Sequence, residues 1–176
     1  MDFFEAINQR YSYKHAFLPT PVPMEDLIKI ADAGLKAPTG ANAQYVSLMI
    51  LDRDALDKLC GIVSTEGLRT APAAILLMTD PALQKGAENF EVEDYAAAAE
   101  NMLLAAVALD YASLWLDSPF FKEDVQIAAK ALFSIPDRFH LRVILPVGYP
   151  AQDGSRREKI PVSKRLFLNM YGKEAL

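Results

Sequence analysis

Three short polar clusters carry the side chains of this chain that could do chemistry. They are Arg10-Tyr11-Ser12-Tyr13-Lys14, then Pro38-Thr39-Gly40-Ala41-Asn42-Ala43-Gln44, and finally Gly148-Tyr149-Pro150 followed by Arg156-Arg157-Glu158-Lys159. Each cluster combines cationic or amide side chains with a turn, which suits a flat anionic ligand rich in nitrogen and oxygen atoms. One such cluster alone would mean little, so their combination is the informative feature.

The first and third clusters supply the parts of an anion site. Arg10, Ser12 and Lys14 alternate, so in an extended segment their side chains project from one face. Arginine offers a rigid fork of donors, lysine a mobile charge and serine a hydroxyl, which together suit a phosphate or a polarised carbonyl. Three further cations lie between positions 156 and 159, although the net charge of the chain is −5. One anion site built from both clusters would explain them together, whereas two solvated basic loops are the plain alternative.

The second cluster offers amide groups. Asn42 and Gln44 are two positions apart, so they can point to the same side of the chain. Each amide both donates and accepts hydrogen bonds, which matches the edge of a uracil-like ring. Gly40 permits a turn that its neighbours would not easily make. An ordinary turn-rich connection between a helix and a strand is the alternative interpretation.

The elements that must position these clusters follow from hydrophobic periodicity. The pattern predicts helices over 3–10, 24–36, 53–60, 91–111 and 123–133, and strands over 45–51, 72–78, 113–116 and 141–147. The tail from 162 to 171 alternates weakly, which favours a further strand. Strands separated by helices of different lengths indicate an α/β or α+β sandwich.

Length and composition exclude several classes of protein. A chain of 176 residues without repeats or a composition break is predicted to form one domain, residues 1–176. The acidic balance argues against a nucleic-acid partner, and one cysteine with two histidines argues against a structural zinc site. The start lacks the positive region of a signal peptide, and the longest apolar run, 102–109, is far shorter than the roughly 20 residues that span a bilayer. We therefore expect a cytoplasmic protein with no membrane partner.

Taken in their order along the chain, the three polar clusters and several other segments resemble sequence elements of the FMN-binding nitroreductase family. Residues 10–14 are similar to its Arg-x-Ser-x-Lys/Arg element, and residues 38–45 to its Pro-Ser-x-x-Asn-x-Gln-Pro loop, with Thr39 for the serine and Tyr45 for the last proline. The other similar segments are Thr70-Ala71-Pro72 at a strand entry, Ala98 to Ala106 in a central helix, Ser113-Leu114-Trp115-Leu116, and Leu145 to Pro150. Glu100 stands where the family more usually has glutamine.

The resemblance implies an α+β fold with a central mixed or antiparallel sheet flanked by helices. It also implies a homodimer with one FMN at each of two interface sites. The cofactor-binding residues that it implies are Arg10, Tyr11, Ser12, Lys14, Pro38, Thr39, Gly40, Asn42, Gln44, Asp117, Ser118, Arg157 and Lys159. Residues 38–42 would come from the partner subunit, and a backbone N–H at Asp117 or Ser118 would face flavin N5.

The implied activity is that of an FMN-dependent oxidoreductase, which transfers hydride from NAD(P)H through flavin N5 to a small-molecule acceptor such as a nitroaromatic or quinone. No catalytic acid or base is implied, because the flavin carries the chemistry. Alternatives are a specialised flavin reaction such as dehalogenation or flavin breakdown, a non-catalytic flavin carrier or redox sensor, and a flavin-free dimer that binds another phosphate compound or a protein. The chain departs from the family where Asp110, Ala112 and Asp117 replace common glycines, and it is short for the family.

Overall fold

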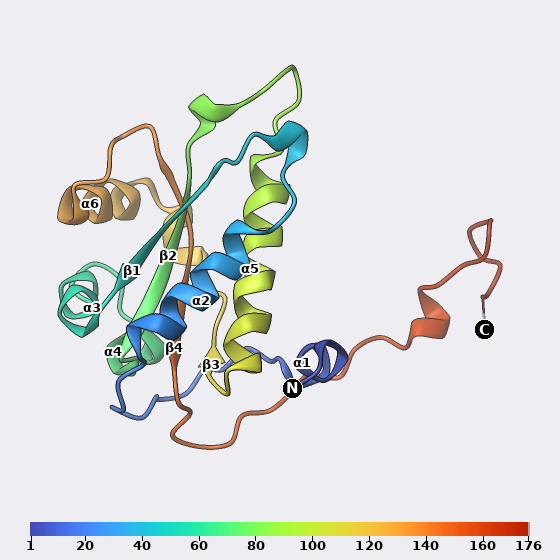
Figure 1. Ribbon diagram of the computed structural model, residues 1–176, viewed down its shortest axis with the longest axis horizontal. Helices are drawn as coiled ribbons and strands as arrows, with labels where there is room; N and C mark the ends of the chain where they lie inside the picture. The colour runs from blue at the N-terminus through green and yellow to red at the C-terminus, as the bar shows by residue number, and fades with distance from the viewer. Residues whose placement is uncertain (176) are drawn as a thin grey trace.

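The computed structural model describes residues 1–175, and its centre is a four-stranded antiparallel sheet with the strand order β1-β2-β4-β3 (Figure 1). The strands are Val46–Leu51 (β1), Ala73–Thr79 (β2), Ala112–Ser113 (β3) and His140–Gly148 (β4). β2 is buried along its whole length, because helices cover both faces of the sheet. The predicted α+β fold with an antiparallel sheet flanked by helices is therefore confirmed.

Alternation along β2 divides the core into two layers. Leu76 and Met78 pack on the face covered by α3 (Arg53–Leu59), α4 (Glu66–Thr70) and α6 (Glu123–Phe133), whereas Ile75 and Leu77 pack on the opposite face. That opposite face is covered by α2 (Met24–Leu35) and α5 (Glu91–Ala108) (Figure 1). Successive side chains of a strand point to opposite faces, so one apolar run fills both layers.

Helix α5 approaches α2 closely because small residues line the contact. A Cβ at Gly34 would lie 2.7 Å from Cγ of Met102, and the Asn101 side chain donates to the carbonyl of Ala33 at 3.1 Å. The short helix α1 (Phe3–Gln9) packs on α5 as well and starts with a capping box formed by Asp2 and Glu5. The end of α1 therefore delivers Arg10 to the side of α5.

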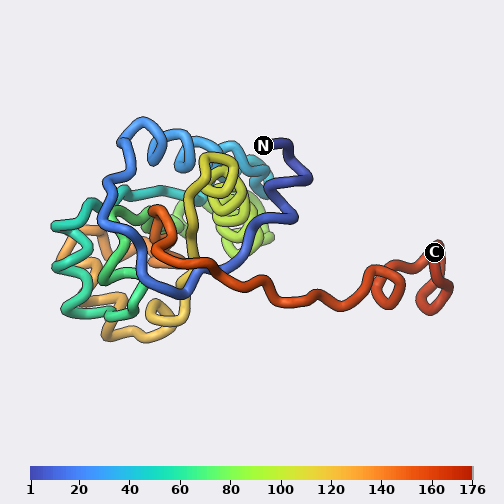
Figure 2. The backbone as a smooth tube through the Cα atoms, turned by 90° about the horizontal axis from the view of Figure 1, so that it is seen from below, coloured from blue at the N-terminus to red at the C-terminus, as the bar shows by residue number. Residues whose placement is uncertain are grey.

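The carboxyl-terminal segment, residues 155–175, leaves the body of the protein as an extended arm (Figure 2). It contains one 3₁₀ turn, Val162–Lys164, and a single bridge between Phe167 and Glu174. The strand predicted over 162–171 is wrong, because no other strand within residues 1–175 lies beside this segment to pair with it.

Two other elements differ from the prediction. Helix α4 has only five residues and was not predicted. The strand expected over 113–116 is reduced to β3, with Leu116 adding an isolated bridge to Ile144. Within residues 1–175, no helix has both the length and the apolar character needed to cross a membrane.

Candidate functional site

Tyr13 ties the first polar cluster to the end of β4. Its ring is fully buried, and its backbone N–H donates to the carbonyl of Ser113 at 2.9 Å. The Tyr13 hydroxyl donates to the carbonyl of Ala16 at 2.5 Å and accepts the N–H of Ala151 at 2.9 Å. Phe17 then forms a bridge with Pro150. The segment after α1 is thus fixed beside the residues that lead into the third cluster.

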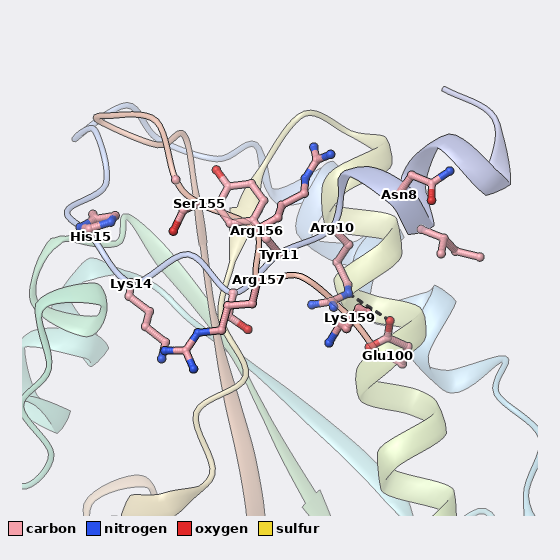
Figure 3. Close-up of a pocket in the computed structure, with 13 residues that line it drawn as sticks. Asn8, Arg10, Tyr11, Lys14, His15, Glu100, Ser155, Arg156, Arg157 and Lys159 are labelled. Carbon is pink, nitrogen blue, oxygen red and sulfur yellow. Dashed lines mark ion pairs between the residues drawn. The ribbon is translucent and has the colours of Figure 1, made fainter. Parts of the chain in front are cut away.

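The first and third clusters line one open cavity of about 750 Å³ (Figure 3). Five of the residues that line it are cationic: Arg10, Lys14, Arg156, Arg157 and Lys159. Ser12 and Tyr11 belong to the same lining, and Lys14 and Arg157 reach toward the same space in Figure 3. The structure therefore brings together cations that lie more than a hundred residues apart in the sequence, as an anion site requires.

Gly154 lets the chain pass close to Tyr11 in the lining of this cavity. A Cβ added at Gly154 would overlap the ring of Tyr11, so the chain can pass the tyrosine only because position 154 has no side chain. Sequence reasoning did not single out Gly154, because nothing in its neighbours indicates which ring it would approach. The contact places the ring of Tyr11 beside the cationic loop.

Glu100 of α5 is the one carboxylate in this lining among residues 1–175. Its Oε1 lies 3.3 Å from Nε of Arg10, and the Glu100 side chain is half exposed (Figure 3). The other four cations of the lining form no ion pair within residues 1–175. The sequence signal for Glu100 was its place in the central helix, where it stands in the position of a more usual glutamine.

The second cluster lines a separate cavity of about 340 Å³. Among the residues that form it are Pro38, Thr39, Asn42 and Gln44. Asn42 and Gln44 both have positive φ, 51° and 58°, a conformation that costs a residue with a side chain some strain. The loop is therefore held in an unusual shape that turns these two amide-bearing residues to the surface, where both are exposed.

Contacts with Asp94 of α5 and with Phe90, which precedes α5, fix the position of the loop that contains Gly40. The N–H of Gly40 donates to Oδ1 of Asp94 at 2.9 Å, and a Cβ at Gly40 would overlap the ring of Phe90. Asp94 is buried and lines the second cavity, and its other oxygen, Oδ2, has no hydrogen-bond partner among residues 1–175. Lys85 adds a hydrogen bond of 2.5 Å to the carbonyl of Asn42.

Asp117 and Ser118 line neither cavity. The carboxylate of Asp117 accepts a hydrogen bond of 2.8 Å from the indole of Trp115, and Ser118 begins a 3₁₀ turn. That a backbone N–H of Asp117 or Ser118 faces flavin N5 stays a prediction. Asp110 has a φ of 64°, so an aspartate here adopts the left-handed conformation that glycine usually provides.

The sequence profile of the Nitroreductase family matches residues 7–67 and 63–149. The chain belongs to the nitroreductase family. The resemblance stated from the polar clusters is thereby confirmed.

Relatives within the nitroreductase family are similar over most of their length. A protein of Methanothermobacter thermautotrophicus, named provisionally as an NADH dehydrogenase/NAD(P)H nitroreductase, is 31% identical over 160 residues, which cover 90% of this chain and 82% of the relative. A protein of Archaeoglobus fulgidus with the same provisional name is 34% identical over 131 residues, 73% of this chain and 75% of its own. A provisionally named nitroreductase from Desulfovibrio desulfuricans, solved in complex with FMN, superimposes with a TM-score of 0.83 at 26% identity, covering 97% of this chain and 98% of that one.

Proposed function

We propose that this protein is an FMN-dependent oxidoreductase that transfers hydride from NAD(P)H to an electrophilic acceptor such as a nitroaromatic or quinone. The cavity that joins the first and third clusters is the observation that carries the proposal, because its size and charge suit a flavin phosphate. The names of the two relatives and the FMN complex of the structural neighbour support the same activity.

The residues that line the cavity fit FMN. Arg157 and Lys159 present charges with no ion pair in the described part of the chain, so a phosphate would meet donors that are not already satisfied. Ser12 adds a hydroxyl that can donate to a ligand oxygen, and Tyr11 adds an aromatic wall. When bound, FMN supplies the hydride transfer, and the protein supplies binding, orientation and electrostatics.

In this proposal, Lys14 stabilises the negative charge of the reduced flavin. Its side chain is exposed in the cavity and has no acidic partner among residues 1–175. An ammonium beside the pyrimidine oxygen would stabilise the negative charge that reduction places there. Lys14→Ala is therefore expected to slow flavin reduction more than it weakens FMN binding.

We also propose that the protein acts as a homodimer with FMN at the interface. The predicted flavin residues of the first and third clusters line one cavity, whereas Pro38, Thr39, Asn42 and Gln44 of the second cluster line another. Apolar side chains of the arm, including Val162, Met170 and Tyr171, are exposed, and so are Phe3 and Phe4 of α1. Large apolar side chains exposed along one segment support a surface that another chain covers.

The visible spectrum tests the proposed function directly. Flavin bands that bleach when NAD(P)H is added without oxygen, followed by turnover with a nitroaromatic, are the expected result. Bands that persist would indicate a carrier or a different electron donor, and a protein that takes up no FMN would contradict the proposal. Equal rates of flavin reduction in the parent and in Lys14→Ala would remove the role given to Lys14.

A further inference from the structure

Glu100 carries a negative charge in a cavity whose other charged side chains are cationic and would attract an anion. It lies on α5, and it contributes the one carboxylate of a lining that has five cations within residues 1–175. A carboxylate repels the phosphate that those cations attract, and it does so wherever in the cavity the phosphate lies. The ordinary expectation for such a position is a neutral or positive side chain.

The pairing of Glu100 with Arg10 strengthens this effect. Oε1 of Glu100 is 3.3 Å from Nε of Arg10, and the Arg10 side chain is only 23% exposed, so the carboxylate lies beside this guanidinium in the lining of the cavity (Figure 3). An anion that binds to Arg10 must therefore compete with a partner that the protein already supplies. Lys14, Arg157 and Lys159 have no such competitor in the described chain.

We propose that Glu100 sets the affinity of the cavity for phosphate-bearing ligands by occupying Arg10 and repelling the phosphate, so that FMN is held reversibly and exchanges with free FMN. The effect is specific to charge. It weakens ligands with a phosphate and leaves the same ring system without a phosphate unaffected. This inference rests on the proposed function for the identity of the ligand, but the charge effect itself applies to any phosphate compound.

The variant Glu100→Gln tests the proposal, because it removes the charge and keeps the size of the side chain. Dissociation constants of FMN and of riboflavin are measured for the flavin-free full chain by quenching of flavin fluorescence. We expect Glu100→Gln to bind FMN roughly three- to tenfold more tightly, the range expected when one exposed ion pair and one like-charge repulsion are removed. Riboflavin, which lacks the phosphate, is expected to bind equally to both proteins.

Two control variants separate this effect from others. Glu93→Gln removes the same charge from an exposed position of α5 that lines neither cavity, and it is expected to leave both affinities unchanged. In an Arg10→Gln background, the gain from Glu100→Gln should be smaller, because there is no longer a guanidinium to release.

The outcomes are distinct. Unchanged or weaker FMN binding by Glu100→Gln would overturn the proposal, and an equal loss for riboflavin would show instead that Glu100 accepts a hydrogen bond from a part common to both flavins. If the parent binds neither flavin, the proposed function fails, and calorimetry with inorganic pyrophosphate then tests the charge effect alone. In that case tighter pyrophosphate binding by Glu100→Gln supports the inference, and equal binding overturns it.

Discussion

A buried ion-pair network at the start of α5 gives the sharpest test of what holds this fold together. Glu91 is 3% exposed, and its Oε1 accepts hydrogen bonds from the hydroxyl of Thr79 and the guanidinium of Arg142. The same oxygen lies 2.7 Å from Nδ1 of His140. Burial by itself raises the pKa of Glu91, but the hydrogen bonds from Thr79, Arg142 and His140 outweigh it, so the pKa lies below its usual value.

We expect Glu91→Gln to lower the free energy of unfolding by about 3 kcal/mol. Removing one partner of a buried ion pair costs roughly 3–5 kcal/mol, because the other charge is left without compensation. The lower end applies here, because the side chains of Arg142 and His140 are 24% and 46% exposed and water can replace part of what they lose. For a protein of this size, the loss corresponds to a melting temperature lower by roughly 6–12 °C.

The contribution of Glu91 to stability depends on pH, and the direction of its pKa shift fixes the sign of that dependence. A carboxyl group whose pKa is lower in the folded than in the unfolded state stabilises the protein above the unfolded value, about 4.3 for glutamate. That contribution is lost as the pH falls through the folded-state pKa. The difference in stability between the parent and Glu91→Gln should therefore be complete at neutral pH and shrink below about pH 4.

Urea denaturation at neutral and acidic pH measures both effects. Glu93→Gln is the matched control, since Glu93 is exposed two positions further along the same helix, and it should change stability by no more than about 0.5 kcal/mol. If Glu91→Gln unfolds at the same urea concentration and with the same slope as the parent, the network does not stabilise the fold as reasoned here.

Three further predictions concern the two cavities and the arm. Gly154→Ala should weaken FMN binding about tenfold in a fluorescence titration, because the new methyl group must displace the ring of Tyr11; unchanged affinity would show that the wall can yield. Gly40→Ala should lower stability in urea by roughly 1–3 kcal/mol, because its methyl group overlaps Phe90, and a value near zero would contradict the close packing. Sedimentation should give a dimer for the full chain and a weaker or absent dimer once the chain is truncated after Gly154, whereas a monomeric full chain would refute the proposed assembly.

The main helices and strands could be predicted because their sequence patterns are strong. β2 is apolar from Ala73 to Met78 and buried at every position, and α2 and α6 repeat apolar residues at helical spacing. Helix α4 was not predicted, because five residues are too few to show a helical period and its only local signal is the Thr65 cap. The arm was predicted as a strand because exposed apolar residues alternate along it, and a sequence does not show whether a strand has a neighbour to pair with.

The candidate site was predicted in composition but not in arrangement. The residue types at 10–14 and 156–159 indicated an anion site, yet the contact that joins them depends on Tyr13, which reads in the sequence as one more aromatic residue. Its hydroxyl bonds the backbone of residues 16 and 151, a relation between distant segments that local patterns do not contain. The ion pair of Glu100 with Arg10 depends in the same way on the packing of α1 against α5.

The geometry of α5 places the two cavities on different sides of one helix. Asp94 and Glu100 lie six positions apart, and at 3.6 residues per turn their side chains point in directions about 120° apart around the helix. Asp94 supports the second cavity and Glu100 lines the first, so the two cavities open on different sides of the same helix. This arrangement supports the proposed homodimer, in which a second copy of the chain would bring residues of the first and second clusters to one flavin.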